Sequence, residues 1–395
     1  MTTLTTEEFE MLYDVARRFV LEKLRPLEEE LDTNDGVPRD VWSQLTKTSI
    51  DLGLYNANVP AEFGGAGLTQ VQLADLNGLI GLTSWPFIYL MARPSPLLFG
   101  ASPEQQEEYL KPVMAAQRSQ CFALTEPDAG SYTAGIKTRA EKVPGGWSIT
   151  GSKHFISNGE LADFVIVIAV TGQNERGRPE TTAFFVDKEP NGFSVAGRQE
   201  GIGFRGVQQR EIVFDHAFVP DNKILGEVGQ GMDHGFRFIA ERRLALAAWC
   251  VGVQQRAIDL SVAFLYNRMV DGGMAITKQG LRWKLAQMEA DYFACNAVLR
   301  AAADKSELVL RSAPGELPVS VVREAMKEVS IAKWMTTTAA NRAADTAVQL
   351  HGGLGWTKGY PTERMFRDVR ATRIMDGTDE IHQEIIAREV ISSRK

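Results

Sequence analysis

The order of local patterns along the 395 residues constrains the fold more than any single motif. Residues 7 to about 115 show helical spacing, with Phe9, Leu12 and Ala16 on one apolar face. From about Cys121 to Gly226 the apolar stretches are short and rich in β-forming residues, and helical spacing returns after that. The pattern predicts a mainly α-helical protein with a central β domain.

Within the central stretch, strands are predicted at 147–157, 164–170, 181–187 and 210–214. Because no helical stretch separates them, they favour a small antiparallel barrel or sandwich over a parallel sheet with crossover helices. The C-terminal part is rich in alanine and predicts long helices at 236–267, 281–310 and 319–350.

Composition excludes several classes of protein. The net charge of −7 argues against a general nucleic-acid binder, which needs a basic excess. The longest apolar run, Leu244 to Val253, is about half the length of a membrane-spanning helix. Four acidic residues near the N-terminus argue against a targeting peptide, and three widely spaced cysteines argue against a disulfide framework. We therefore expect a cytoplasmic protein without a membrane span.

Several chemistries lack their motifs. The chain has no Gly-Lys dipeptide for a P-loop, no Gly-x-Ser-x-Gly elbow, and no metal-ligand spacing among its histidines, so no metal site is expected. Residues 201–206 (GIGFRG) fit a dinucleotide-binding motif literally, but a strand-like segment follows them instead of the required helix. We interpret these glycines as a loop between strands.

Two segments carry the functional prediction. Residues 122–131 (FALTEPDAGS) predict a strand end followed by a tight loop, which presents backbone N–H groups and hydroxyls to a phosphate or a flavin. At the C-terminal end, Asp376 is followed by Gly377 and Thr378, just before a helix predicted to begin near Asp379. Glycine at this point permits close approach of a ligand.

With these motifs the chain resembles the acyl-CoA dehydrogenases, flavoproteins that oxidise acyl-CoA thioesters between Cα and Cβ. The resemblance covers nearly the whole length, and its motifs in chain order are PAEFGGAGL (60–68), ALTEPDAGS (123–131), KHFISNG (153–159), Glu241-Arg242-Arg243, QLHGGLG (349–355) and the block 360–381. It implies an N-terminal helical domain (1–118), a middle β-barrel (119–228) and a C-terminal four-helix bundle (229–395). It also implies FAD as cofactor and a homo-oligomer, usually a tetramer, with a dimer as the alternative.

The resemblance also assigns residues. Those matching the family's flavin contacts are Phe122, Leu124, Thr125, Gly130, Ser131, Phe155, Ser157, Arg268, Gln279, Gln349, Gly352, Gly353, Thr378 and Glu380. Among them, Arg268, Gln279, Gln349 and the two glycines match residues that reach the FAD of another subunit. Ser131, Arg243 and Gly377 match substrate-side positions. Arg93 falls on the segment that lines the acyl pocket, and our hypothesis is that it pairs a carboxylate or polar group of the substrate.

The chemistry implied is removal of an α-proton by a positioned carboxylate while the β-hydride passes to flavin N5. Most family members carry Glu where this chain has Asp376, which is one methylene shorter. A branch of the family places its base at the position of Arg242, which is basic here, so Asp376 is the base we predict. Tyr132, and residues 269–272 after Arg268, also depart from the family pattern.

The predicted activity is therefore FAD-dependent dehydrogenation of an acyl-CoA, with an electron-transfer flavoprotein as electron acceptor. Two alternatives remain open at this point. One is a relative with different chemistry, either a flavin oxidase or an enoyl-CoA reductase. The other is a catalytically silent FAD-binding scaffold, in which Asp376 would only cap the start of a helix.

Overall fold

The computed structural model describes residues 4–175, 177–190, 192–312 and 317–394. The chain divides into two compact units. Unit 1 contains Met1–Arg93, Ile202–Gly206 and Ala240–Lys395, and unit 2 contains Pro94–Gly201 and Val207–Ile239. In the described part of the chain, no helix combines the length and apolar character needed to cross a membrane.

The N-terminal part of unit 1 is helical where its apolar residues follow helical spacing. Its helices are α1 (Thr6–Phe19), α2 (Glu28–Asn34), α3 (Arg39–Asp51) and α4 (Gln70–Ile80). Thr5 and Glu8 form a capping box that starts α1, and Ala16 and Phe19 are buried on the predicted face. Between α3 and α4, and after α4, the chain runs through turns and short 3₁₀ segments, so this part of unit 1 is not one continuous helical stretch.

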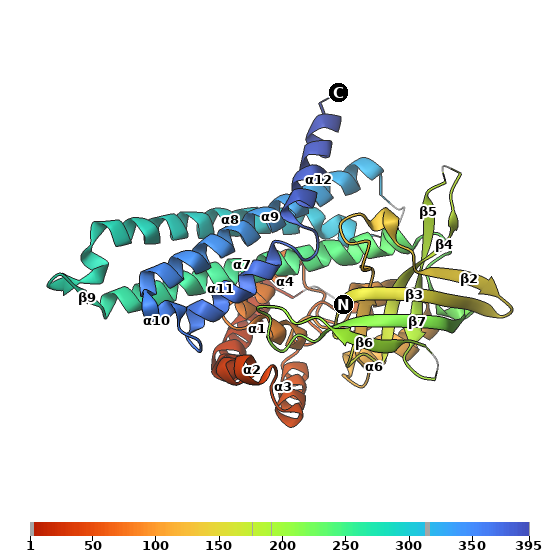
Figure 1. Ribbon diagram of the computed structural model, residues 1–395, viewed down its shortest axis with the longest axis horizontal. Coiled ribbons are helices and arrows are strands. Elements are labelled where there is room, and N and C mark those ends of the chain that lie inside the picture. The colour runs from red at the N-terminus through yellow and green to blue at the C-terminus, as the bar shows by residue number, and fades with distance from the viewer. Residues whose placement is uncertain (1–3, 176, 191, 313–316, 395) are drawn as a thin grey trace. The chain divides into compact units, whose positions relative to one another are not determined.

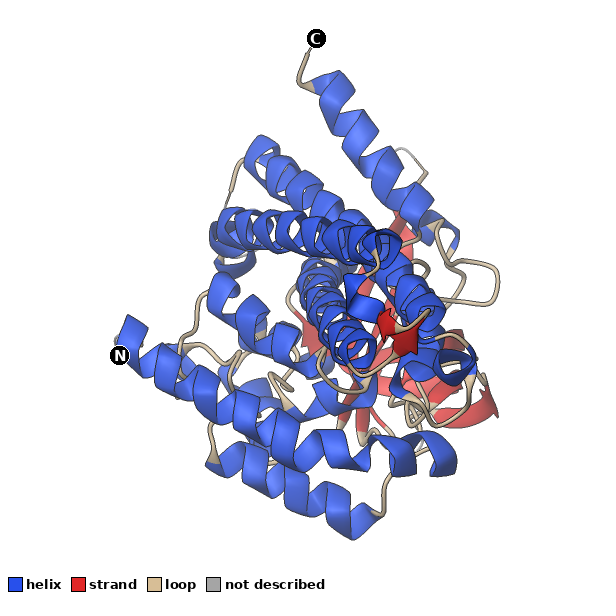
Figure 2. Cartoon of the chain, turned by 90° about the vertical axis from the view of Figure 1, so that its left-hand side faces the viewer, coloured by secondary structure: helices blue, strands red, loops and turns tan. Residues whose placement is uncertain are grey.

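Three long helices form the C-terminal part of the chain and run side by side (Figure 1). They are α7 (Gly231–Tyr266), α8 (Gln279–Arg311) and α9 (Val319–His351), and each prediction of a long helix is confirmed. Small residues let them pack closely, since Ala247, Ala303 and Ala332 belong to one buried cluster. The helices α10 (Gly353–Trp356), α11 (Pro361–Thr372) and α12 (Asp379–Ser392) complete unit 1, and Figure 2 views the bundle nearly end-on.

A buried ion pair connects three helices of unit 1. Both terminal nitrogens of Arg256 (α7) donate to the Glu28 carboxylate (α2), at 2.6 and 2.7 Å, and Arg364 (α11) lies 3.4 Å from the same carboxylate. All three side chains are almost fully buried. Breaking such a pair leaves an uncompensated buried charge, so these residues fix how the helices pack.

Unit 2 is built on an eight-stranded sheet with the order β6-β7-β3-β2-β4-β5-β8, and β1 pairs with β4. The strands are β1 (Gln120–Ala123), β2 (Arg139–Val143), β3 (Gly146–Ser157), β4 (Phe164–Gln173), β5 (Pro179–Asp187), β6 (Ser194–Arg198), β7 (Gln209–Pro220) and β8 (Ile224–Leu225). All four predicted strands are present. The pairing is mainly antiparallel, as expected, but β4 is parallel to β1 and to β2.

Short helical turns precede the sheet in unit 2, among them α5 (Pro103–Gln105) and α6 (Lys111–Met114). Between them, Tyr109 stacks on Phe185 of β5 with ring centroids 4.4 Å apart, and its hydroxyl donates to Asp187 at 3.0 Å. The sheet's own core contains Trp147, Phe184 and Phe214. Trp147 and Phe214 are each followed by a less buried residue, whereas β5 is buried continuously from Thr181 to Val186.

The GIGFRG segment is a loop between β6 and β7, which confirms the interpretation against a dinucleotide motif. Its residues Ile202–Gly206 belong to unit 1. The Phe204 amide donates to Asp368 at 2.6 Å, the Gly206 amide donates to Asp35 at 2.8 Å, and the Phe204 ring stacks on Trp85. Gly203 is required because a Cβ there would lie 2.6 Å from the Arg367 carbonyl oxygen.

Candidate active site

The predicted base lies in the turn between α11 and α12. Asp376 has φ +54° and therefore adopts the left-handed conformation, and Gly377 follows with φ +103°. A non-glycine residue held in this region costs on the order of 1–3 kcal/mol and persists only where its surroundings impose it. Thr378 caps α12 by accepting a hydrogen bond from the Ile381 amide at 3.4 Å, so the predicted helix start is confirmed.

Two cationic side chains donate hydrogen bonds to the backbone of this turn and hold its conformation. Arg243 of α7 donates from Nε to the Asp376 carbonyl at 2.8 Å, and Lys333 of α9 donates from Nζ to the Gly377 carbonyl at 2.6 Å. Burial lowers the pKa of the Lys333 ammonium to about 8, although the carboxylates of Asp376 and Asp379 act in the opposite direction. Two neighbouring carbonyls are thus held by charged donors from two separate helices.

The Asp376 carboxylate remains available for chemistry. Its Oδ2 atom is buried and has no hydrogen-bond partner among the described residues. The Asp376 amide likewise has no backbone acceptor in the described part of the chain. A carboxylate oxygen without a partner and a nearby free N–H are the groups that proton abstraction next to a thioester carbonyl requires.

His382 lies beneath the same turn and is completely buried. A Cβ on Gly377 would lie 3.1 Å from His382 Nε2 and 3.2 Å from Arg243 Nη2, which explains glycine at this position. Burial, together with the charges of Arg243 and Lys333, lowers the pKa of His382 to about 3, so the imidazole is neutral near pH 7. The backbone carbonyls of Gly377 and Asp376 act in the opposite direction, but they do not outweigh burial.

Sequence reasoning missed Lys333 and His382. The signal for Lys333 was present, because it follows the buried Ala325 and Val329 by eight and four residues and so lies on the apolar face of an Ala-rich helix. His382 follows Thr378 by four residues and so lies on the same face of α12. By contrast, Glu380 is exposed, and Arg242 lies over the Trp85 ring at 5.6 Å.

In unit 2, a buried ion pair holds the FALTEPDAGS loop. Lys153 is fully buried and donates to the Leu124 carbonyl at 2.9 Å and to Glu126 Oε1 at 2.8 Å. The Glu126 carboxylate also accepts from the Lys137 amide at 2.6 Å and the Thr138 amide at 2.9 Å. Burial alone would raise the pKa of Glu126, but the ammonium of Lys153 and these hydrogen bonds outweigh it and lower the pKa. Both residues lie inside the recognised motifs, yet neither was singled out.

The aromatic residue of the KHFISNG segment is presented to solvent. Phe155 has φ +56° and is 56% exposed, which is unusual for a bulky residue in the left-handed region. The neighbouring His154 amide donates to the Thr125 carbonyl at 2.8 Å, and the two rings are stacked with centroids 4.5 Å apart. Ser157 is half-buried at the end of the same strand. The ring of Phe155 is therefore accessible on the described surface of unit 2.

The remaining predicted contacts of unit 2 differ in exposure. Gly130 and Ser131 are exposed, and a Cβ on Gly130 would meet no atom within 4 Å. Phe122 packs on Phe238 with centroids 4.4 Å apart. Leu124 is buried and its carbonyl is occupied by Lys153, so its side chain belongs to the core of the loop.

Another predicted set lies far from Asp376 along the bundle. Arg268 and Gln279 flank the turn formed by β9 (Met269–Val270) and β10 (Gly273–Met274), while Gln349, Gly352 and Gly353 lie where α9 meets α10. Figure 1 shows both segments at the same end of the long helices. All five residues are exposed. Because Gln349 follows Lys333 by 16 residues of one helix, about 24 Å separates them, so this set and Asp376 cannot share one small site within a chain.

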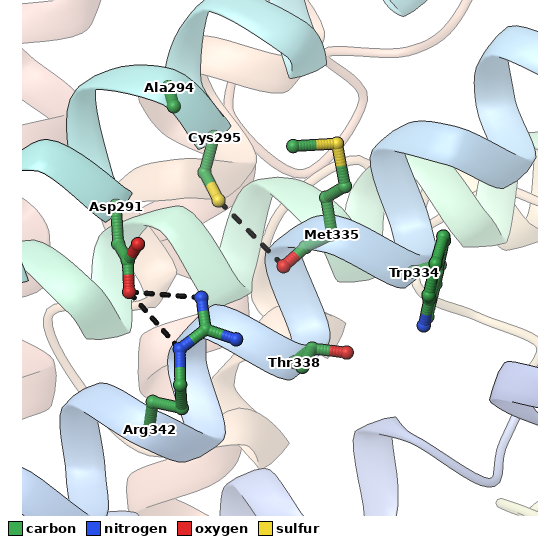
Figure 3. Close-up of a pocket in the computed structure, with 7 residues that line it drawn as sticks. All are labelled: Asp291, Ala294, Cys295, Trp334, Met335, Thr338 and Arg342. Atoms are coloured by element: carbon green, nitrogen blue, oxygen red, sulfur yellow. Dashed lines mark hydrogen bonds and ion pairs between the residues drawn. The ribbon is translucent and has the colours of Figure 1, made fainter.

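Arg93 is half-buried in unit 1. Its guanidinium lies 5.2 Å from the centroid of the Tyr89 ring, and its amide donates to the Tyr55 carbonyl at 2.8 Å. A cavity of about 180 Å³ lies elsewhere in this unit, between α8 and α9 (Figure 3). Its lining includes Cys295, whose thiol contacts the Met335 carbonyl, and the Asp291–Arg342 ion pair, but none of the predicted site residues.

Family models match almost all of the chain. They are the acyl-CoA dehydrogenase N-terminal domain (residues 6–117), middle domain (121–217) and C-terminal domain (229–391).

Three full-length relatives and one solved structure illustrate the similarity. An acyl-CoA dehydrogenase of Bacillus subtilis is 31% identical, with 98% of both chains covered, and an acryloyl-CoA reductase (NADH) of Anaerotignum propionicum is 32% identical, with 98% and 95% covered. The caffeyl-CoA reductase-Etf complex subunit CarC of Acetobacterium woodii is 28% identical, with 97% and 98% covered. An acyl-CoA dehydrogenase complexed with FAD from Bacillus anthracis has a TM-score of 0.87 and 27% identity, covering 99% of this chain and 68% of that one.

Proposed function

Because the chain belongs to the acyl-CoA dehydrogenase family of oxidoreductases, we propose that it catalyses FAD-dependent α,β-dehydrogenation of an acyl-CoA thioester, with Asp376 as the base. The observation that carries the assignment is the buried Asp376 Oδ2 atom, which has no partner among the described residues in a turn held by two cations. A carboxylate in this setting can accept a proton without first breaking a hydrogen bond.

In the proposed reaction, Asp376 takes the α-proton while the thioester carbonyl oxygen accepts a hydrogen bond from the Asp376 amide. Both groups come from one residue, so the conformation of the turn sets the distance between base and oxyanion donor. Bound FAD supplies the acceptor for the β-hydride. Arg243 and Gly377 lie beside the base, and we propose that they and Ser131 contribute to the substrate site.

The residues of unit 2 fit a flavin. An aromatic ring in strained backbone is exposed at Phe155, hydroxyls are present at Thr125, Ser131 and Ser157, and Gly130 leaves open space for close approach. We propose that these residues, with Phe122 and the backbone of Leu124, hold FAD in each chain, and that Thr378 and Glu380 add contacts. The Lys153–Glu126 pair would keep the loop in shape before FAD binds.

We further propose that the chain is a homo-oligomer, with a tetramer expected. The exposed set Arg268, Gln279, Gln349, Gly352 and Gly353 would serve the FAD of a second copy, because it is remote from Asp376 along the bundle. Apolar side chains surround this set, since Met269, Met274, Leu354 and Trp356 are all strongly exposed, the last by 80%. Such a surface favours burial against another protein chain.

An electron-transfer flavoprotein is the electron acceptor we propose, and a relative named as a subunit of a reductase-Etf complex supports it. We place the enzyme in the cytoplasm, because Cys121, Cys250 and Cys295 form no disulfide with one another, as expected in a reducing compartment. The domain boundaries proposed from the sequence remain 1–118, 119–228 and 229–395.

A reductase is the second candidate, because the relative at 32% identity is named an acryloyl-CoA reductase. The same base and flavin geometry would serve either direction of the α,β step. Two rates should be compared at equal substrate concentration: reduction of an enoyl-CoA by the reduced flavoenzyme, and reduction of the oxidised enzyme by the saturated acyl-CoA. If the first reaction is faster, the reductase is favoured.

Anaerobic flavin bleaching tests the main proposal. Saturated acyl-CoAs of different chain lengths should bleach the absorbance near 450 nm of the purified holoenzyme, and Asp376→Asn should retain FAD but lose the bleaching. Rapid turnover with oxygen would indicate an oxidase, while no bleaching by any thioester would favour a silent scaffold. An active Asp376→Asn variant would overturn the base assignment.

A further inference from the structure

Lys333 is the feature of this site that packing does not explain. Its side chain is completely buried in α9, yet among the described residues its ammonium makes one hydrogen bond, to the Gly377 carbonyl. Burying an ammonium costs several kcal/mol, and replacing a buried charge by an apolar side chain of similar volume is often neutral or stabilising. A methionine would fill the same space, so the charge itself needs a reason.

The surroundings of Lys333 are mixed in charge. Asp376 in the turn and Asp379 at the start of α12 favour its charged form, as does the Cys250 thiol of α7, while Arg243 of α7 opposes it. The neutral His382 of α12 lies beneath the same turn. Arg373 pairs with Asp379 at 2.6 Å, so Asp379 already has a cationic partner. The acid near Lys333 without such a partner among the described residues is Asp376.

The two cations act on neighbouring peptide units. Arg243 holds the carbonyl of Asp376 and Lys333 holds the carbonyl of Gly377. Because each peptide unit is planar, fixing both carbonyls fixes the backbone on the C-terminal side of Asp376. Chirality at Cα then sets the direction of the side chain. An aspartate has one rotatable bond fewer than a glutamate, so this base depends more on its backbone than the usual residue does.

We propose that Lys333 is a positioning residue for the base: its ammonium holds the Gly377 carbonyl and, with Arg243, keeps Asp376 in the left-handed conformation that aims its carboxylate at the substrate. This inference rests on the proposed function.

A pH dependence follows. Burial lowers the pKa of Lys333 to about 8, so the folded enzyme loses this charge well below the usual range for lysine. As the pH rises through about 8, the neutral amine holds the Gly377 carbonyl less firmly, and the rate of flavin reduction should fall. This fall in rate on the alkaline side of the pH profile should be absent from a variant without the lysine. A lysine that only stabilises the fold would not produce such a difference between the two profiles.

The test compares Lys333→Met with Lys327→Met in the holoenzyme. Lys327 lies on the same helix, six residues before Lys333, and its partly exposed side chain pairs with Glu324 and Glu328. We expect Lys333→Met to retain FAD and acyl-CoA affinity within about threefold, to reduce flavin about 100-fold more slowly, and to lose the limb near pH 8. Lys327→Met should match the wild type. A Lys333→Met enzyme with the wild-type rate and pH profile would overturn the inference.

Hydrogen exchange of the protein without substrate gives a second measurement. Peptides covering residues 374–382 should exchange faster in Lys333→Met than in the wild type and in Lys327→Met, and equal exchange would contradict the inference. If no thioester bleaches the wild-type flavin, the proposed function is wrong. Hydrogen exchange of this segment would still test whether Lys333 holds the turn, because it requires no substrate. If Lys333→Met does not fold, the wild-type profile decides, since a rate that stays constant from pH 7 to 9.5 excludes the role.

Discussion

Lys153 and Glu126 form an ion pair of 2.8 Å in which the side chains are 0% and 5% exposed. The pair joins β3 to the loop that follows β1, and its carboxylate holds two further amides of the same region. A loop that must present hydroxyls and backbone groups to a cofactor is thereby fixed by a charge pair beneath it.

Removing the lysine should destabilise unit 2 and weaken FAD binding. Lys153→Met leaves the Glu126 carboxylate buried and unpaired, which costs about 3–5 kcal/mol. Urea unfolding and the FAD content of the purified protein measure the two effects. Lys142→Met is the control, because it removes an exposed partner of Asp221 and should cost less than about 1 kcal/mol. Equal losses in both variants would contradict the role of the buried pair.

Gly377→Ala should impair catalysis by crowding as well as by backbone strain. Its Cβ would press against His382 and Arg243 at 3.1 and 3.2 Å, in a conformation with φ +103°. We expect a loss of about 1–2 kcal/mol in stability and about a hundredfold in the rate of flavin reduction. Gly359→Ala separates backbone strain from crowding. Gly359 also has a positive φ, of +84°, but the nearest atom to its added Cβ is a carboxylate oxygen of Glu29 at 3.9 Å. Should both variants keep the wild-type rate, the turn tolerates displacement and the argument fails.

Asp368→Asn should stabilise the protein at alkaline pH. Burial raises the pKa of Asp368 from 3.8 to about 7, so between these values the folded state holds a proton that the unfolded state releases, and stability falls as the pH rises. A pKa difference of one unit corresponds to about 1.4 kcal/mol, so the ionisation of Asp368 above pH 7 lowers the free energy of unfolding by at most about 4 kcal/mol. Asparagine removes this cost and can still accept the Phe204 amide.

Thermal unfolding at pH 5.5 and 8.5 checks this sign. The Tm of Asp368→Asn should exceed that of the wild type by several degrees at pH 8.5 and by less at pH 5.5. Asp51→Asn is the control, because it replaces an exposed carboxylate paired with Lys47, and its Tm should differ from that of the wild type by the same amount at both pH values. A variant that is destabilised equally at both pH values would show that Asp368 acts through its shape instead of its ionisation.

Arg93→Ala tests the substrate hypothesis. If the guanidinium pairs a carboxylate or polar group at the end of the acyl chain, its loss should lower kcat/KM for such substrates by about 10- to 100-fold, as expected for a hydrogen bond to a charged group. Uncharged acyl-CoAs should be affected much less. Unchanged kcat/KM for both kinds of substrate would remove Arg93 from the substrate site and leave its contact with Tyr89 as its role.

The sequence by itself determined the features that arise locally. The helical spacing of α7, α8 and α9, the β-forming residues of β3 to β5, the Thr378 cap and the loop character of GIGFRG all follow from residues close together in the chain. The family is likewise carried by linear motifs. These features could be predicted because each depends on neighbours within a few positions.

The tertiary structure decided how the base is held. Arg243 and Lys333 reach the turn from 133 and 44 residues away, and Arg256 meets Glu28 across 228 residues. Hydrogen bonds over such separations leave no periodic pattern, because their partners are brought together by helix packing and not by chain proximity. The sequence motif was sufficient to predict Asp376 as the base. Its left-handed conformation, and the two cations that hold it, became visible only in the folded chain.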